Sequence, residues 1–187
     1  MIVATNNKGK LKEIKEIFTE EPIFSLKDKG ISVDVEEDQD TFVGNAKKKA
    51  MEIYKLTHEA TIADDSGLCI NALNGFPGVM THRFLGDEAT DEMRNEHLIN
   101  EVDKHNDRSA KVVCVIVYYD GEKLITREGV LEGFISKERR GSNGFGFDEI
   151  FELPNGLTLA ELTAEEKNKV SARSLALEDL KKKLSVK

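Results

Sequence analysis

Residues 110–130 read AKVVCVIVYYDGEKLITREGV. The largely apolar run from Ala110 to Tyr119 predicts a buried strand, and Asp120-Gly121 has the composition of a turn. Lys123 to Val130 then predicts a second strand, so the stretch is expected to form a hairpin. Outside this hairpin, strand-like stretches alternate with amphipathic, helix-like stretches toward both ends of the chain. A hairpin placed between such alternating elements is typical of an α/β protein with a mixed sheet.

Periodicity predicts the remaining elements. Short apolar or alternating runs predict strands at Ile2–Ala4, Ile31–Val35, Thr61–Ala63, Leu68–Leu73 and Ile150–Leu153. Helical spacing predicts helices over residues 11–18, 42–54, 91–102 (with Met93, Leu98 and Ile99 inward) and 171–184. Thr41 is a predicted N-cap, and Thr163-Ala164-Glu165-Glu166 fits a capping box that begins a further helix.

Composition excludes several classes of protein. The chain has 187 residues, of which 39% are hydrophobic and 33% charged, with a formal net charge of −8. Its longest apolar run, Val112 to Tyr119, is far shorter than the ~20 residues of a membrane helix, so we expect no membrane partner. Because nucleic-acid affinity comes from a basic surface, we expect no nucleic-acid partner either.

The cysteines and the N-terminal residues predict where the protein is located. Cys69 and Cys114 lie far apart and outside any CxxC spacing, which indicates a reducing compartment. Met1-Ile2-Val3-Ala4 shows no basic region followed by a long apolar stretch, so we expect no signal peptide. These observations predict a cytoplasmic protein.

The first predicted strand is followed by a polar loop, Thr5-Asn6-Asn7-Lys8-Gly9-Lys10, and then by a helix. A helix N-terminus offers backbone N–H groups and a positive dipole to phosphate oxygens, and two lysines would add charge. An ordinary strand–helix connection with solvated lysines is the alternative. The loop is not a Walker A motif, because G-x-x-x-x-G-K-[ST] is absent.

Asp64-Asp65-Ser66-Gly67 is the strongest candidate for chemistry. Paired carboxylates at a strand end suit Mg²⁺, which binds one or two carboxylates together with substrate phosphates. Neighbouring strand residues face opposite sides, so Asp64 and Asp65 should have different roles. A plain turn is the alternative. The acidic stretch Glu36-Glu37-Asp38 could bring a further ligand. Of the three lysines Lys47-Lys48-Lys49, Lys49 is best placed to reach inward; the alternative is that all three lie on the surface.

A glycine-rich loop covers Gly141 to Asp148. Its glycines follow the order G-x-x-G-x-G before a strand, the reverse of a dinucleotide fingerprint, which argues against a nicotinamide site. The phenylalanines Phe145 and Phe147 could instead stack on a purine beside Asp148. A surface loop whose phenylalanines pack into the core is the alternative.

In chain order, these segments resemble the inosine triphosphate pyrophosphatase (Ham1-like) family. The matching motifs are Thr5 to Lys10, Thr41-Phe42 with Asn45-Ala46, Ala63 to Leu68, Gly75-Phe76-Pro77-Gly78-Val79, Gly144 to Asp148, and Ala160-Glu161-Leu162 through Glu165 to Lys169. They run from residue 1 to about residue 177. Each motif is weak alone, whereas the ordered set is specific.

The resemblance implies an enzyme that hydrolyses ITP, dITP and XTP to the nucleoside monophosphate and pyrophosphate, and so cleanses the nucleotide pool. It also implies a fold: one two-lobed domain over residues 1–187, with an elongated mixed sheet flanked by helices, a central substrate cleft, and a homodimer. A Maf-like pyrophosphatase with another base preference, or a non-catalytic nucleotide-binding protein, is the alternative.

The resemblance also implies roles for residues. Asp65 would bind Mg²⁺ and act as general base, and Glu37, or else Glu36, would be the other metal carboxylate. Lys49 would stabilise charge on the phosphates. The residues implied to bind substrate are Thr5, Asn6, Asn7, Lys8, Gly9, Lys10, Ser66, Phe145, Gly146, Phe147, Asp148, Lys167, Ala172 and Arg173.

Four positions depart from the family pattern. Ala172 stands where the family usually has His, so one contact to the base edge is missing and we expect a weaker preference for ITP over ATP. In the glycine-rich loop, Phe147 replaces Tyr and Glu149 replaces Pro. Gly44 replaces Glu, which removes the capping box at that helix start and predicts a looser first turn.

Overall fold

The structure is a computed structural model that describes residues 1–185. Six strands form one sheet in the order β2-β1-β3-β4-β5-β6. Their bounds are β1 (Ile2–Val3), β2 (Phe24–Ser25), β3 (Thr61–Ile70), β4 (Ser109–Tyr119), β5 (Leu124–Ile135) and β6 (Phe151–Glu152). Strand β1 pairs in parallel with β2 and β3, whereas β5 and β6 are antiparallel. The predicted mixed sheet is therefore confirmed.

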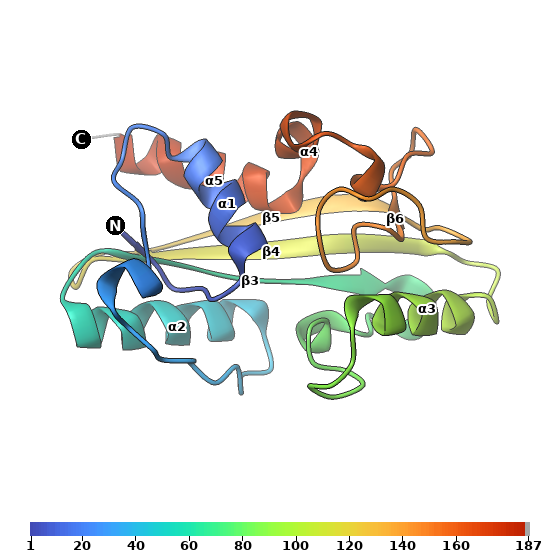
Figure 1. The fold of residues 1–187 in the computed structure, drawn as a ribbon, viewed down its shortest axis with the longest axis horizontal. Helices are drawn as coiled ribbons and strands as arrows, with labels where there is room; N and C mark the ends of the chain where they lie inside the picture. The colour runs from blue at the N-terminus through green and yellow to red at the C-terminus, as the bar shows by residue number, and fades with distance from the viewer. Residues whose placement is uncertain (186–187) are drawn as a thin grey trace. The chain divides into compact units, whose positions relative to one another are not determined.

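Helices flank this sheet, as predicted (Figure 1). The α-helices are α1 (Lys8–Ile17), α2 (Phe42–Thr57), α3 (Asp91–Val102), α4 (Ala164–Val170) and α5 (Ala172–Ser185). Short 3-10 helices cover Lys27–Lys29, Asn71–Leu73, Gly78–Met80 and Leu159–Glu161. Within residues 1–185, no helix is both long enough and apolar enough to cross a bilayer.

The chain divides into two compact units. Unit 1 comprises Met1–Ser66, Cys114–Gly129 and the stretch from Ala172 onward, and unit 2 comprises Gly67–Val113 and Val130–Ser171. Strands β3, β4 and β5 each contribute residues to both units.

In unit 1, helices cover both faces of the sheet. Helices α1 and α5 lie together on one face, and α2 lies on the other (Figure 1). Strand β3 is buried at nearly every position, as expected for a strand with both faces covered. Gly129 of β5 allows a close approach to α5, because a Cβ added there would lie 1.9 Å from the carbonyl oxygen of Ala172.

In unit 2, a buried arginine organises the loop before α3. The Arg94 guanidinium donates to the carbonyl oxygens of Phe84, Gly86 and Ala89 at 3.0, 2.8 and 2.7 Å. These bonds satisfy a turn that includes Leu85 at φ +66°, an uncommon conformation for a residue other than glycine. Met93, predicted to face inward, is 52% exposed, whereas Leu98 and Ile99 are buried as predicted.

Two strand predictions were wrong. Ile31–Val35 forms no strand, because β2 occupies the position beside β1 and the backbone of residues 31–35 has no partner strand in the sheet. Thr61–Ala63 and Leu68–Leu73 are not separate strands either. One continuous strand, β3, runs through Asp64-Asp65-Ser66-Gly67, so this motif is not a turn.

The predicted helix starts are confirmed. The Thr41 hydroxyl accepts a hydrogen bond from Gly44 N at 3.0 Å and so caps α2. Thr163 and Glu166 form a reciprocal capping box at the start of α4. Local sequence was sufficient here, because both partners of each cap lie within one helical turn.

Candidate active site

Asp64 and Asp65 point to opposite faces of β3, as strand geometry requires. On the face covered by α1 and α5, the fully buried Asp64 carboxylate lies between two cations. Its Oδ2 is 3.1 Å from Lys10 Nζ and 3.1 Å from Arg173 Nη2. Asp64 Oδ1 is also buried and accepts no hydrogen bond from any residue of the described chain.

A fourth charged residue, Glu13 of α1, belongs to this cluster, and its carboxylate pairs with the Arg173 guanidinium. Burial alone would raise the pKa of Asp64, but the charges of Lys10 and Arg173 outweigh it and hold that pKa well below its usual range. Burial would lower the pKa of Arg173, yet Asp64 and Glu13 contribute to raising it. Asp64 and Arg173 are therefore both held in their charged forms, within a cluster of two basic and two acidic side chains.

Ser66 belongs to the same face, because it lies two residues beyond Asp64 along the strand. Its Oγ accepts a hydrogen bond from Arg173 Nη2 at 2.9 Å. Ala172, the neighbour of Arg173, is the buried first residue of α5. The structure thus places Arg173 in unit 1 with Asp64 and Ser66; the contacts of Ala172 and Arg173 with a base stay predictions.

On the opposite face of β3, Asp65 lies against α2. Asn45 Nδ2 donates to Asp65 Oδ2 at 2.9 Å, and the Ser66 backbone N–H donates to Asp65 Oδ1 at 3.0 Å. Lys49, one helical turn after Asn45, is 8% exposed and pairs with the Glu37 carboxylate. The inward orientation predicted for Lys49 is thus confirmed.

Ionised Asp65 is costly in this environment. Burial raises the pKa of Asp65 to about 6, Glu37 adds repulsion, and the charge of Lys49 only partly offsets both. Burial would lower the pKa of Lys49, but Asp64, Glu37 and Asp65 together raise it. A bound cation would offset the burial and the Glu37 repulsion that disfavour the ionised form of Asp65.

The donor set fits Mg²⁺. Asp65 and Glu37 supply carboxylate oxygens, and each Asp65 oxygen, with one hydrogen bond, keeps capacity for a second partner. Within residues 1–185 no group of three or more His, Cys, Asp or Glu side chains forms a ready-made metal cage. Mg²⁺ commonly binds one or two carboxylates and completes its shell with water and substrate phosphates. Glu36 is part of the same loop, and its predicted alternative role as ligand stays a prediction.

The loop from Thr5 to Lys10 joins β1 to α1. Asn7 is the N-cap of α1, and its Oδ1 accepts from Gly9 N and Lys10 N at 2.9 and 3.1 Å. The Thr5 hydroxyl accepts from Asn7 N at 3.1 Å. These bonds fix the loop, while Lys8 is exposed. Phosphate binding by the loop stays a prediction.

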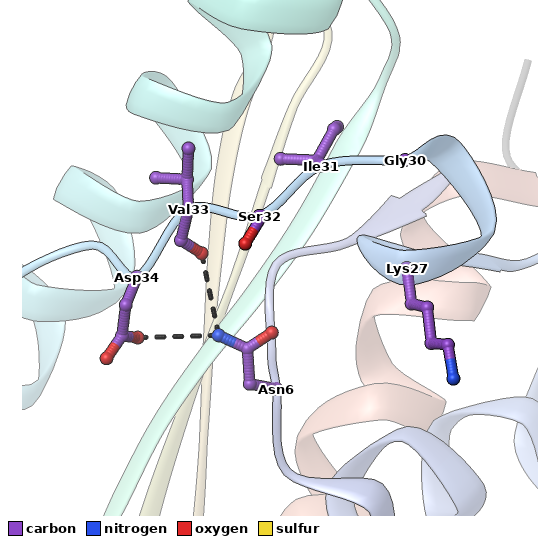
Figure 2. Close-up of a pocket in the computed structure, with 7 residues that line it drawn as sticks. All are labelled: Asn6, Lys27, Gly30, Ile31, Ser32, Val33 and Asp34. Atoms are coloured by element: carbon purple, nitrogen blue, oxygen red, sulfur yellow. Dashed lines mark hydrogen bonds between the residues drawn. The ribbon is translucent and has the colours of Figure 1, made fainter.

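Asn6 points away from α1 toward the segment that follows the first 3-10 helix. Its Nδ2 lies 3.5 Å from Val33 O and 3.5 Å from Asp34 Oδ1 (Figure 2). A cavity of about 600 Å³ opens beside it, lined also by Lys27, Gly30, Ile31 and Ser32. Unit 1 therefore has open volume next to the predicted phosphate loop.

In unit 2, three of the predicted base-binding residues, Phe145, Asp148 and Lys167, form one cluster. Lys167 Nζ lies 2.6 Å from Asp148 Oδ2 and 4.6 Å from the centroid of the Phe145 ring. Asp148 Oδ2 also accepts from Phe145 N at 2.9 Å. Gly144 has to be glycine, because it has φ +78° and a Cβ there would lie 2.1 Å from Asp148 Oδ2.

Sequence reasoning missed the residues that hold these groups in place. Asn45 contacts Asp65, Glu13 contacts Arg173, and Asn95 donates to Gly146 O at 2.9 Å. Asn45 belongs to the family motif Thr41-Phe42 with Asn45-Ala46, so the sequence did carry a signal that this residue matters. Glu13 and Asn95 carry no sequence signal, because their partners lie 160 and 51 residues away.

This α/β fold has a lysine-bearing loop after its first strand, and it pairs buried carboxylates with lysines. Both features define a class of proteins suited to anionic, phosphate-bearing ligands. A sequence profile of the Ham1 family matches residues 1–183. The chain belongs to the Ham1 family.

Relatives match this chain over most of its length. A dITP/XTP pyrophosphatase of Clostridium tetani is 39% identical, covering 98% of this chain and 95% of the relative. A dITP/XTP pyrophosphatase of Bacillus subtilis is 42% identical, covering 98% and 96%. Among solved structures, a HAM1 protein from Coxiella burnetii has a TM-score of 0.89 at 39% identity, covering 98% of this chain and 97% of that one. The Staphylococcus aureus Ham1 protein has a TM-score of 0.88 at 36% identity, covering 98% and 96%.

Proposed function

We propose that this chain is a Mg²⁺-dependent nucleoside triphosphate pyrophosphatase. It hydrolyses non-canonical purine nucleoside triphosphates (ITP, dITP and XTP) to the nucleoside monophosphate and pyrophosphate, and so cleanses the nucleotide pool. The observation that carries the proposal is the cluster of buried Asp65 and Lys49 with half-buried Glu37 in a chain of the Ham1 family. The names of its relatives supply the substrate class.

The groups around Asp65 suit water attack on the innermost phosphorus. Asp65 acts as general base and takes a proton from the attacking water, whose oxygen forms the new bond to that phosphorus. The bond from the α-phosphorus to the bridging oxygen breaks, and pyrophosphate leaves with both electrons. Lys49 neutralises negative charge that grows on the leaving group.

Asp65 and Glu37 would hold Mg²⁺. When bound, Mg²⁺ lowers the pKa of water and neutralises phosphate charge. The ionised form of Asp65 is then favoured, because the cation offsets the burial and the Glu37 repulsion that raise the pKa of Asp65 in its absence. The exposed Lys8 and the backbone of Thr5 to Gly9 would bind the triphosphate oxygens, whereas buried Lys10, predicted from the sequence to join them, is paired with Asp64.

The loop of unit 2 suits a purine base. Phe145 and Phe147 offer aromatic faces for stacking, and Asp148 with Lys167 offers an acceptor and a donor for the base edge. Buried polar groups that lose their partners when the wrong base binds discriminate strongly, so this pair is suited to setting base preference.

Incubation with a panel of ITP, dITP, XTP, ATP and GTP in the presence of Mg²⁺ tests the function directly. We expect pyrophosphate in amounts equal to the monophosphate formed, with ITP, dITP and XTP turned over faster than ATP and GTP. Pyrophosphate and orthophosphate are assayed separately, with no pyrophosphatase present. Release of orthophosphate alone would mean stepwise removal of the γ-phosphate and would contradict the proposal.

We also propose that the protein is a cytoplasmic homodimer. Unit 2 exposes large apolar side chains at Phe76, Met80, Leu85 and Met93, which are between 39% and 52% exposed, as interface residues of a free subunit often are. Free thiols at Cys69 and Cys114 fit a reducing compartment. Sedimentation equilibrium is expected to give twice the mass of one chain, and a mass of one chain at micromolar concentration would contradict the dimer.

A further inference from the structure

Asn45 is a buried amide that contacts two functional segments at once. It is fully buried in the first turns of α2. Its Nδ2 donates to Asp65 Oδ2 at 2.9 Å, and its Oδ1 accepts from the backbone N–H of Gln39 at 3.0 Å. Because a carboxylate oxygen can only accept and an N–H can only donate, these partners fix which end of the amide faces which side.

The segment that Asn45 holds is the acidic loop with Glu37. Three consecutive loop residues are tied to α2: Glu37 pairs with Lys49, Asp38 Oδ1 lies 2.9 Å from Lys48 Nζ, and Gln39 N–H bonds to Asn45. Of these three ties, the Lys48 pair is the most exposed, with 23% and 45% of the side chains accessible. The bond from the Gln39 N–H ends on the fully buried Asn45 side chain, so its acceptor is shielded from solvent.

Gly44 provides the space for this arrangement. A Cβ added to Gly44 would lie 2.8 Å from Gln39 Cβ and 3.0 Å from Thr41 Oγ1. Any larger residue would therefore push Gln39 away from the helix. The glycine that removes a capping box from α2 thus lets the loop pack closely against the helix start.

We propose that Asn45 is a positioning residue that fixes the Asp65 carboxylate relative to the loop carrying Glu37. A single rigid amide bonds both segments, so it sets the spacing and orientation of the two carboxylates before any ligand binds. The inference rests on the proposed function, because it concerns the same carboxylates. Asn45 makes no contact of its own with substrate in this role; it acts through Asp65 and through Gln39.

Asn45→Ala tests the inference, with Asn71→Ala as matched control, because Asn71 is an exposed residue of unit 2 whose side-chain amide donates to Ser109 Oγ. Asn45→Ala is expected to weaken Mn²⁺ binding, measured by electron paramagnetic resonance without nucleotide, by about 10–100-fold. Turnover of ITP is expected to fall by about 10–100-fold at saturating Mg²⁺, with KM for ITP changed less than kcat. Asn71→Ala is expected to match the wild-type chain in both measurements.

A second measurement, hydrogen exchange, needs no enzymatic activity. In the wild-type chain, the Gln39 amide proton is expected to exchange with solvent at least 100-fold more slowly than an unprotected amide, because its acceptor is a buried side chain. Gly44→Ala is expected to accelerate exchange at Gln39 while the Asn45–Asp65 bond remains.

The outcomes separate the inference from the proposed function. Wild-type Mn²⁺ affinity in a folded Asn45→Ala chain, or unprotected exchange at Gln39 in the wild-type chain, would overturn the positioning role. A wild-type chain that hydrolyses no triphosphate would instead remove the proposed function. The Mn²⁺ and exchange measurements would still decide the role of Asn45 in that case.

Discussion

Asp65→Asn is expected to lower ITP turnover by at least about 10³-fold while the fold persists, because it removes both the proposed proton acceptor and the charge of a proposed Mg²⁺ ligand. Asn has the shape of Asp, so the packing is retained, but its NH2 group replaces one acceptor and leaves either Asn45 Nδ2 or the Ser66 N–H without a partner. Losing that one hydrogen bond is expected to cost about 1–3 kcal/mol of stability, although burial, which raises the pKa of Asp65 to about 6, also disfavours the carboxylate. Pyrophosphate release and urea unfolding measure the two effects.

Asp87→Asn is the matched control, because it makes the same chemical change at an exposed carboxylate of unit 2. It is expected to leave both turnover and the unfolding free energy unchanged. An Asp65→Asn chain with more than about a tenth of wild-type turnover would rule out Asp65 as the general base, since that role is worth about 10²–10⁴-fold.

Asp64→Asn is expected to cause a larger loss of stability than Asp65→Asn. The substitution leaves Lys10 and Arg173 buried without their shared carboxylate. Removing one partner from a buried ion pair typically costs about 3–5 kcal/mol. That is a large share of a total stability of about 5–15 kcal/mol, and urea unfolding monitored by circular dichroism measures it.

Asp179→Asn provides the comparison for that loss. Asp179 pairs with Arg127 at 2.8 Å, but its side chain is 63% exposed. Exposed pairs contribute about 0–1 kcal/mol, so this variant should unfold within about 1 kcal/mol of the wild-type chain. If Asp64→Asn and Asp179→Asn lost equal amounts, the buried cluster would not be the stabilising element that its geometry indicates.

The sequence predicted elements whose determinants are local. The hairpin of β4 and β5 follows from two apolar runs around a turn, and the α4 capping box from residues three apart. Family motifs led to Asp65, Lys49 and Glu37, which the structure brings together. These features could be predicted because each depends on neighbours in the chain or on an ordered motif.

The errors concern residues whose environment depends on distant segments. Asp64-Asp65-Ser66-Gly67 has the composition of a turn, yet it is a strand, because cations from α1 and α5 satisfy Asp64 and an amide from α2 satisfies Asp65. Ile31–Val35 alternates apolar and polar residues as a strand does, but it forms no strand, because strand pairing depends on which edge of the sheet is free. The partnership of Glu13 with Arg173 spans 160 residues, which no local pattern encodes.

The opposite orientations of two adjacent carboxylates have a consequence for how this protein can evolve. The residue that holds the buried ion cluster together and the residue proposed to carry out hydrolysis are encoded by successive codons but face opposite sides of one strand. A mutation that silences Asp65 would spare the fold and the predicted phosphate loop, so a descendant could lose hydrolysis and keep a scaffold for nucleotide binding in a single step. A mutation at Asp64 offers no such route, because it would cost much of the stability of that scaffold.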